Sequence, residues 1–368
     1  MIQDEFYASA MACTHFLPDH HWRSVRERMQ DIADSPHCEH RADRYGAGGF
    51  VEVFEKELAE LFGKEAAVFM PSGTMAQQIA LRIWADRAAN NTVAFHPMCH
   101  LHTHEHMAYR ELHHLEAVLL GEPDRLFTLE DLKAVERPVS SLLIEFPQRD
   151  IGGQLPTWEE LGAITAYARS RGMKLHVDGA RLWECAPYYR RPYKEIVADF
   201  DSVYVSFYKI LFGLPGAALA GPADFIAEAR IWMRRHGGNL AHMFPNAISA
   251  KIGMDKRLPL IPRYVAKAAE VASILNALDG VTVVPNHPPT NMMHLYFDAP
   301  KDELMDAVGQ IAEREKCLLI AGVNDTERGR MYELSIGDAG LDIPEHRLRD
   351  LFTEMLRLAS RLAESKSA

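Results

Sequence analysis

From about residue 50 to residue 221, short apolar segments alternate with segments of helical periodicity. The apolar segments are about four to eight residues long, and turn-forming residues separate them from helices of about 10 to 15 residues. This alternation predicts an α/β fold with a mainly parallel sheet that helices cover on both faces. The expected strands are residues 66–70, 92–95, 115–120, 139–146, 175–178, 202–207 and 216–221.

The pattern changes after about residue 246, and a second unit of α+β type is expected there. It contains a helix interrupted at Pro259 and Pro262, apolar strands at residues 292–297, 317–321 and 331–336, and a final helix. Near the N-terminus, apolar residues at helical spacing predict one amphipathic helix: Trp22, Val25, Met29 and Ile32. The expected division is a segment at 1–49 that packs on the small domain or a second subunit, a large domain at 50–250 and a small domain at 251–368.

Composition excludes several classes of protein. The 368 residues carry 40 Lys and Arg against 51 Asp and Glu, a formal charge of −11, which argues against a nucleic acid partner. No apolar run approaches the roughly 20 residues of a membrane span. The odd number of cysteines, without CxxC spacing, indicates reduced thiols, so we expect a soluble cytoplasmic enzyme with a small-molecule substrate. The five are Cys13, Cys38, Cys99, Cys185 and Cys317.

Three motifs place polar residues at strand ends, where open α/β sheets bind ligands. Ser72-Gly73-Thr74 lies between a strand and a helix, so its backbone N–H groups and hydroxyls can hold an anion. Asp178 ends an apolar strand, and its carboxylate can bind a protonated ring nitrogen. Lys209 follows a strand among apolar neighbours, which lower the pKa of an amine and make it a nucleophile.

Taken singly, each motif also has a structural interpretation: a plain turn, an aspartate that caps a turn, and a lysine that extends to solvent. Together, a phosphate cradle, a partner for a ring nitrogen and an imine-forming lysine are what pyridoxal phosphate requires. Their order along the chain, with Lys209 31 residues after Asp178, makes a chance coincidence hard to explain. The sequence therefore predicts pyridoxal phosphate as the cofactor.

The chain resembles the threonine aldolase and aromatic amino acid β-eliminating lyase family of fold-type I pyridoxal phosphate enzymes. The matching stretches are residues 63–81, 175–183, 200–221 and 229–238. The resemblance implies an aspartate aminotransferase-like large domain with a mainly parallel seven-stranded sheet, and a smaller C-terminal α+β domain. It also implies a homo-oligomer, a dimer or tetramer, with active sites at the subunit interface.

The resemblance further implies roles for individual residues. Lys209 would form the Schiff base, and Asp178 would pair with the pyridine nitrogen. His100 would stack on the ring and assist proton transfer. The other cofactor-binding residues would be Ser72, Gly73, Thr74, Arg181 and Ser206, and Tyr45 would lie near the active site of the neighbouring subunit.

A cluster of histidines follows the second predicted strand. His100 and His104, like His102 and His106, are four residues apart, a spacing that can bind a metal from one helix face. The chain has no HExxH motif, and a stacking His100 with solvated neighbours is the preferred interpretation, with no metal site. The alternative is a non-catalytic protein that keeps the fold and binds metal through this cluster.

Several residues depart from the aldolase pattern. The family's Glu-Asn-Thr-His after the mid-sheet strand is replaced by the EFPQRD segment that begins at Glu145, and the arginine of Gly-Gly-Gly-Met-Arg is missing after Gly237. In the C-terminal domain, Glu333 stands where aldolases carry the arginine that binds the substrate carboxylate. Either Arg330 or Arg149 would then bind this carboxylate, or the substrate is held in a different way.

The resemblance favours a lyase that cleaves a β-hydroxy-α-amino acid to glycine and an aldehyde, with His100 as the base. Loss of the Cα proton instead would give β-elimination, racemisation or transamination, and these alternatives stay open. The substrate-positioning residues decide between the reactions, and these are the residues that depart from the family pattern.

Overall fold

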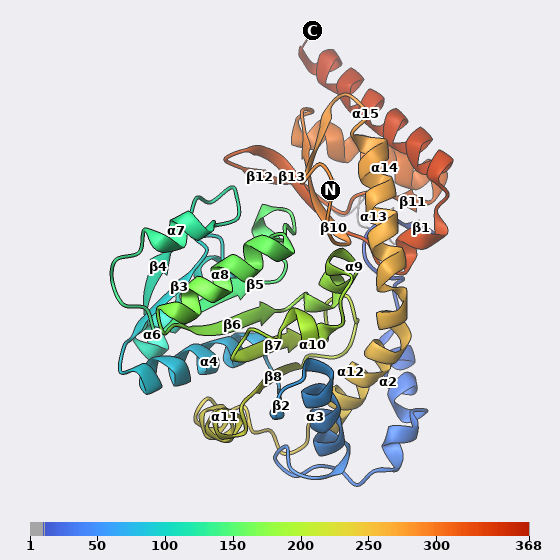
Figure 1. Cartoon of the computed structure of the whole chain (residues 1–368). Coiled ribbons are helices and arrows are strands. Elements are labelled where there is room, and N and C mark those ends of the chain that lie inside the picture. The colour runs from blue at the N-terminus through green and yellow to red at the C-terminus, as the bar shows by residue number, and fades with distance from the viewer. Residues whose placement is uncertain (1–9, 11, 368) are drawn as a thin grey trace. The chain divides into compact units, whose positions relative to one another are not determined.

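The computed structural model describes residue 10 and residues 12–367, which group into two units (Figure 1). The larger unit is Arg23–Pro259, and the smaller contains the described residues up to Trp22 together with those from Leu260. The two units therefore divide between residues 259 and 260. The sequence predicted a division between residues 250 and 251. Residues 23–49 group with the large unit. Residues 1–9 and 11 of the expected N-terminal segment lie outside the described part.

The large unit is built on a seven-stranded sheet with the order β2-β8-β7-β6-β5-β3-β4. β8 is antiparallel to both of its neighbours, and the other pairs are parallel, so the expected mainly parallel sheet is confirmed. Each expected strand is present, with some ends moved by one or two residues. The strands are β2 (Ala66–Met70), β3 (Thr92–Phe95), β4 (Glu116–Leu119), β5 (Ser141–Glu145), β6 (Lys174–Gly179), β7 (Ser202–Ser206) and β8 (Ala217–Gly221).

Helices cover both faces of this sheet. On one face, α4 (Gly73–Ala88) and α11 (Ala223–Arg235) share a buried apolar cluster with β2, β7 and β8, and the rings of Trp84 and Phe225 stack 4.5 Å apart. On the other face, α3 (Gly49–Phe62) places Phe54 against Phe69 and Phe207. The remaining helices of the unit are α2 (Val25–Ala33), α5 (His100–Thr103), α6 (Ala108–His113), α7 (Leu129–Lys133), α8 (Trp158–Ser170), α9 (Ala186–Tyr189), α10 (Tyr193–Ile196) and α12 (Phe244–Arg257).

Two helices of the large unit begin with a capping box. The Thr157 hydroxyl accepts the Glu160 N–H, and the Glu160 carboxylate accepts the Thr157 N–H at the start of α8. Thr128 caps α7 in the same way. The amphipathic helix expected from Trp22 onward is α2, but only Ile32 is buried in it, whereas Val25 and Met29 are exposed. The apolar residues of α2 other than Ile32 therefore do not belong to the hydrophobic core of the described chain.

The small unit contains a four-stranded antiparallel sheet with the order β12-β13-β10-β9. Its strands are β9 (Val281–Val284), β10 (Met292–Phe297), β12 (Asn324–Thr326) and β13 (Gly329–Ser335). The strand expected at 317–321 is only β11 (Cys317–Leu318), and it pairs with β1 (His15–Phe16) rather than with this sheet. The helices are α13 (Ile261–Leu275), α14 (Lys301–Glu315) and α15 (Glu345–Ser367).

The two prolines interrupt the helix between α12 and α13 as expected, because Pro259 lies in a short 3₁₀ turn and Pro262 is at the start of α13. No helix in the described part of the chain is both long and apolar enough to span a bilayer. The five cysteines all lie in the described part and form no disulfide.

Candidate active site

Three polar residues stand side by side at the carboxyl ends of neighbouring strands in the large unit. Glu145 of β5 is paired with Asp178 of β6, and Asp178 with Tyr204 of β7. Paired residues of neighbouring strands point to the same face of a sheet. This face is the one that α4 covers, because His176, two residues before Asp178, donates from Nε2 to the Gln77 side-chain oxygen of α4 at 2.6 Å. The three side chains therefore lie between the sheet and α4.

The N-terminus of α4 reaches this row of residues. A Cβ atom at Gly73 would lie 1.9 Å from the Tyr204 hydroxyl, so only glycine fits at the first position of the helix. The Ser72 side chain makes no capping hydrogen bond, and Thr74 is exposed. The first N–H groups of a helix have no intrahelical acceptor. The Ser72-Gly73-Thr74 turn thus has N–H groups and hydroxyls that an anion could bind.

Asp178 is 2% exposed, and its Oδ1 accepts the Ala180 N–H at 3.1 Å. Burial raises the pKa of this carboxyl, and the charge of Lys209 acts in the opposite direction. A buried carboxylate of this kind gains most from a cationic partner, because water does not screen the pair. Its position suits a protonated ring nitrogen.

Lys209 follows β7 by three residues and is half-buried. Burial lowers the pKa of its amine to about 8, and the Arg181 charge lowers it further, while Asp178 and Glu145 raise it. In the described chain its Nζ makes no hydrogen bond. A sizeable fraction of this amine is therefore neutral near physiological pH, which is the form that attacks a carbonyl carbon.

Ser206 closes β7 and is buried. Its hydroxyl donates to the Ala180 carbonyl at 2.7 Å, and its own carbonyl accepts the Trp183 indole N–H at 2.7 Å. These bonds tie the segment before Lys209 to the segment after Asp178. They hold the two residues in a fixed relation within the unit.

His100 is the first residue of α5, and its Nδ1 lies 2.9 Å from Oε1 of Glu105, which is 8% exposed. Because the carboxylate accepts this bond, Nδ1 carries the proton and Nε2 is the nitrogen left for proton exchange. The backbone N–H of His100 donates to Glu145 Oε2 at 3.3 Å. Its charge also lowers the pKa of Asp178, so the two residues are close enough to interact electrostatically.

Glu145 accepts hydrogen bonds from residues 148 and 149, which belong to the segment that departs from the aldolase pattern. Its Oε2 accepts the Gln148 side-chain N–H at 3.0 Å, and its Oε1 accepts the Arg149 backbone N–H at 3.2 Å. Burial, with the charges of Asp178 and Asp150, raises the pKa of Glu145 to about 8. Strand order reveals this residue as a neighbour of Asp178, which spacing along the chain does not.

Three other histidines near His100 in the sequence, His96, His102 and His104, each have a partner of their own. His96 donates from Nε2 to the Arg125 carbonyl at 2.7 Å and accepts the Met98 N–H at Nδ1. His102 contacts the Tyr109 hydroxyl, and His104 Nε2 lies 2.7 Å from Asp150 Oδ2. No three His, Cys, Asp or Glu side chains of the described residues are grouped to hold a metal ion.

The three expected substrate-binding residues are differently placed. Arg149 lies beside the His100 segment, with Nη1 3.4 Å from His104 Nε2, and its charge lowers the pKa of Lys209. Arg330 is on β13 of the small unit and donates to the carbonyls of Phe297 and Asp298 at 3.2 and 2.6 Å. Tyr45 is exposed, and its N–H donates to the Ala241 carbonyl. Within the described large unit, no contact joins the Tyr45 side chain to the Lys209 surroundings.

The small unit also contains Glu333, the departure from the expected arginine. Its Oε2 lies 3.6 Å from Nε2 of the buried His294, the residue with which it is paired across β13 and β10. This carboxylate therefore has a neighbouring imidazole in its own unit.

Comparison with known proteins gives a consistent result. The family model described as "Beta-eliminating lyase" matches residues 25–299. A crystal structure from Listeria monocytogenes, described as a "putative L-allo-threonine aldolase", is 41% identical with a TM-score of 0.92, over 97% of this chain and 99% of that one. Another, from Exiguobacterium, described as a "putative aromatic amino acid beta-eliminating lyase/threonine aldolase", is 40% identical with a TM-score of 0.91, over 96% and 99%.

A curated relative, low-specificity L-threonine aldolase 1 of Arabidopsis thaliana, is 27% identical over 278 residues. The aligned region is 73% of this chain and 77% of that protein.

Proposed function

The chain belongs to the β-eliminating lyase family, and from this membership and the geometry of the large unit we propose that it is a pyridoxal phosphate-dependent carbon–carbon lyase of threonine aldolase type. The reaction is the cleavage of a β-hydroxy-α-amino acid to glycine and an aldehyde. The observation that carries the proposal is that Asp178 and Tyr204 point to one face of the sheet, where the α4 N-terminus meets Tyr204, and that the charge of Asp178 acts on the Lys209 amine.

These residues fit pyridoxal phosphate. The absent Cβ of Gly73 and the uncapped Ser72 hydroxyl suit the phosphate, and the buried Asp178 suits the pyridine nitrogen. Lys209, with a pKa of about 8 and no hydrogen bond in the described chain, would bond to the aldehyde carbon. When bound, the cofactor supplies an electron sink for the bond that breaks at Cα.

Three further residues would hold the cofactor in place. The family resemblance implies that Arg181 lies near the phenolic oxygen, and this half-buried side chain lowers the pKa of Lys209. Ser206 fixes the Lys209 segment to Ala180 and would contribute through that bond. Thr74, which is exposed at the first turn of α4, completes the phosphate cradle.

His100 is proposed as the base. Its Nδ1 proton is held by Glu105, so Nε2 could take the proton of the substrate β-hydroxyl and, after the aldehyde has left, deliver a proton to Cα to give glycine. Because Glu105 is buried, it also stabilises the imidazolium that forms. Orientation and charge stabilisation thus come from one carboxylate.

Arg149 is proposed to bind the substrate carboxylate, since it is in the same unit as Lys209, whereas the Arg330 guanidinium donates to two backbone carbonyls. Loss of a charged hydrogen bond costs about 1.5–3 kcal/mol, so Arg149→Met raises KM about 10- to 100-fold. Arg330→Met is the matched variant. A raised KM for Arg330→Met with an unchanged KM for Arg149→Met would place carboxylate binding in the small unit.

The test is product analysis with a panel of β-hydroxy-α-amino acids. The proposed reaction yields glycine and an aldehyde in equal amounts, and Lys209→Ala abolishes both. Ammonia with a keto acid and no glycine would instead indicate β-elimination, an inverted substrate would indicate racemisation, and amino group transfer to a keto acid would indicate transamination. Stoichiometric zinc in a protein without pyridoxal phosphate would favour the metal-binding alternative.

The proposal includes a homo-oligomer, dimer or tetramer, in which Tyr45 of one subunit would approach the active site of another. The exposed side chain of Tyr45 is compatible with this. A cytoplasmic location and the lack of a nucleic acid partner stay predictions from composition and cysteine usage.

A further inference from the structure

We propose that the hydroxyl of Tyr208 donates a hydrogen bond to the phosphate of pyridoxal phosphate, and that Tyr204 holds this hydroxyl in position. The inference rests on the proposed function, because it takes this cofactor as the ligand. It adds to the phosphate cradle a side chain that lies outside the turn at residues 72–74.

Tyr208 lies beside the amine that would hold the cofactor. It directly precedes Lys209, and the Lys209 Nζ is 5.9 Å from the centre of the Tyr208 ring. Phe207 and Ile210, on either side of the Tyr208–Lys209 pair, are buried, whereas Tyr208 is 39% exposed. An aromatic side chain left open to solvent next to a buried segment is available to a ligand.

The Tyr204 hydroxyl fixes where Tyr208 points. Tyr204 is 4% exposed, and its hydroxyl interacts with that of Tyr208, which raises the pKa of Tyr204 and lowers that of Tyr208. These opposite shifts are those of a pair in which Tyr204 donates and Tyr208 accepts. The described residues include no acceptor for the Tyr208 proton, so a ligand can accept a hydrogen bond from it.

The same hydroxyl pair lies at the phosphate cradle. Tyr204 is the residue whose hydroxyl would be 1.9 Å from a Cβ at Gly73, the first residue of α4. The Tyr208 hydroxyl interacts with that of Tyr204, and the first N–H groups of α4 have no intrahelical acceptor. An anion bound there meets the backbone donors from one side and the Tyr208 hydroxyl from another.

The surroundings of Tyr208 keep its hydroxyl protonated, so that it can donate a hydrogen bond. Burial raises the pKa of its hydroxyl, and Asp178 raises it further, while Arg181 lowers it. A neutral phenol donates to a phosphate oxygen, whereas a phenolate would repel it. The hydroxyl is therefore in the form that binds phosphate.

The experiment compares two ligands that differ only in the phosphate. The full-length protein, freed of cofactor, is titrated with pyridoxal phosphate and with pyridoxal, and binding is followed by the absorption of the imine. Tyr208→Phe is expected to weaken pyridoxal phosphate binding about 10- to 100-fold, the range for a hydrogen bond to a charged group, and to leave pyridoxal binding unchanged. Tyr204→Phe is expected to give a smaller loss with the same ligand selectivity.

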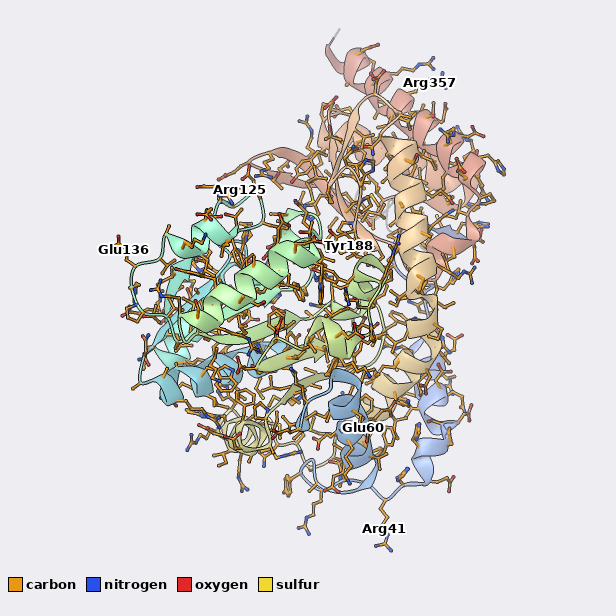
Figure 2. All side chains as sticks on the ribbon, in the orientation of Figure 1. Arg41, Glu60, Arg125, Glu136, Tyr188 and Arg357 are labelled. Carbon is orange, nitrogen blue, oxygen red and sulfur yellow. The ribbon has the colours of Figure 1, made fainter. Side chains whose placement is uncertain are left out.

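Tyr188→Phe is the matched control, because Tyr188 of α9, labelled in Figure 2, is a tyrosine of the same large unit. It is 38% exposed, and its ring contacts that of Tyr189. It is expected to bind both ligands as the unsubstituted protein does. Equal affinity of Tyr208→Phe and the unsubstituted protein for pyridoxal phosphate would overturn the inference and leave the proposed function intact. An equal loss for both ligands would also overturn it, since the hydroxyl would then act on the ring. If the unsubstituted protein binds neither ligand, the proposed function fails with it.

Discussion

Gly73→Ala tests the packing that brings the α4 N-terminus to the sheet. The added Cβ would lie 1.9 Å from the Tyr204 hydroxyl, 2.5 Å from its Cζ and 2.9 Å from its Cε2. Ordinary carbon contacts are about 3.5–4.0 Å, so the ring must move by more than about 1 Å. Tyr204 lies in a buried cluster with Val68, Leu219 and Ala76, which leaves little room for this movement.

The expected magnitude follows from two opposed effects. Overpacking of a filled core costs about 1–3 kcal/mol. Alanine is favoured over glycine inside a helix by up to about 1 kcal/mol, and by less at a first helical residue. The crowding is therefore larger, and Gly73→Ala is expected to lower the free energy of unfolding by about 1–2 kcal/mol. It should also weaken pyridoxal phosphate binding, because the start of α4 is displaced.

The assay is urea unfolding of the cofactor-free protein, followed by pyridoxal phosphate titration. Gly162→Ala in α8 is the matched control, since its Cβ would meet nothing within 4 Å, and it is expected to stabilise the protein by about 0.5–1 kcal/mol. If Gly73→Ala is as stable as Gly162→Ala and binds the cofactor normally, then the Tyr204 contact does not exist as described.

Three further predictions concern charges around the site. Glu105→Gln removes the charge that orients His100 and is expected to lower kcat, measured at saturating substrate, about tenfold or more. Cofactor affinity should change little. An unchanged kcat would show that His100 does not take part in proton transfer. The uptake of pyridoxal phosphate by the cofactor-free protein is expected to accelerate with pH around a midpoint of about 8, because burial lowers the pKa of Lys209 from 10.5; a rate that does not change between about pH 7 and 9 would contradict this. Glu184 is buried and its pKa is raised to about 8 from 4.5, so the folded form keeps a proton that the unfolded form loses, and stability falls as pH rises between these values. Glu184→Gln is therefore expected to lose less stability than the unsubstituted protein between about pH 5 and 8, as measured by urea midpoints, and equal losses would refute the assignment.

The strands of the large unit could be predicted because each is an apolar run bounded by turn residues. The run at 66–70 coincides with β2, and that at 92–95 with β3. Apolar runs fail as a guide where tertiary pairing decides. Residues 317–321 read as one strand, yet only Cys317 and Leu318 pair, and they do so with β1. Helical spacing also does not say what a helix meets, which is why the apolar face of α2 is exposed.

The candidate site could be predicted where its residues sit at strand ends. The turn at residues 72–74, Asp178 and Lys209 are of this kind, since parallel strands bring their carboxyl ends to one edge. The residues that lie beside them on neighbouring strands could not be predicted, because their position depends on strand order. Glu145 meets Asp178 only because β5 lies beside β6, and Tyr204 meets Gly73 only because α4 crosses β7.

The most direct test of the central claim is to locate the cofactor on the chain. The full-length protein is saturated with pyridoxal phosphate, reduced with borohydride and digested, and the modified peptide is identified by mass spectrometry. The structure predicts one modified residue, Lys209, with the label lost in Lys209→Ala and weakened in Asp178→Asn. A label on another lysine, or a protein that takes up no cofactor, would contradict the assignment of this site.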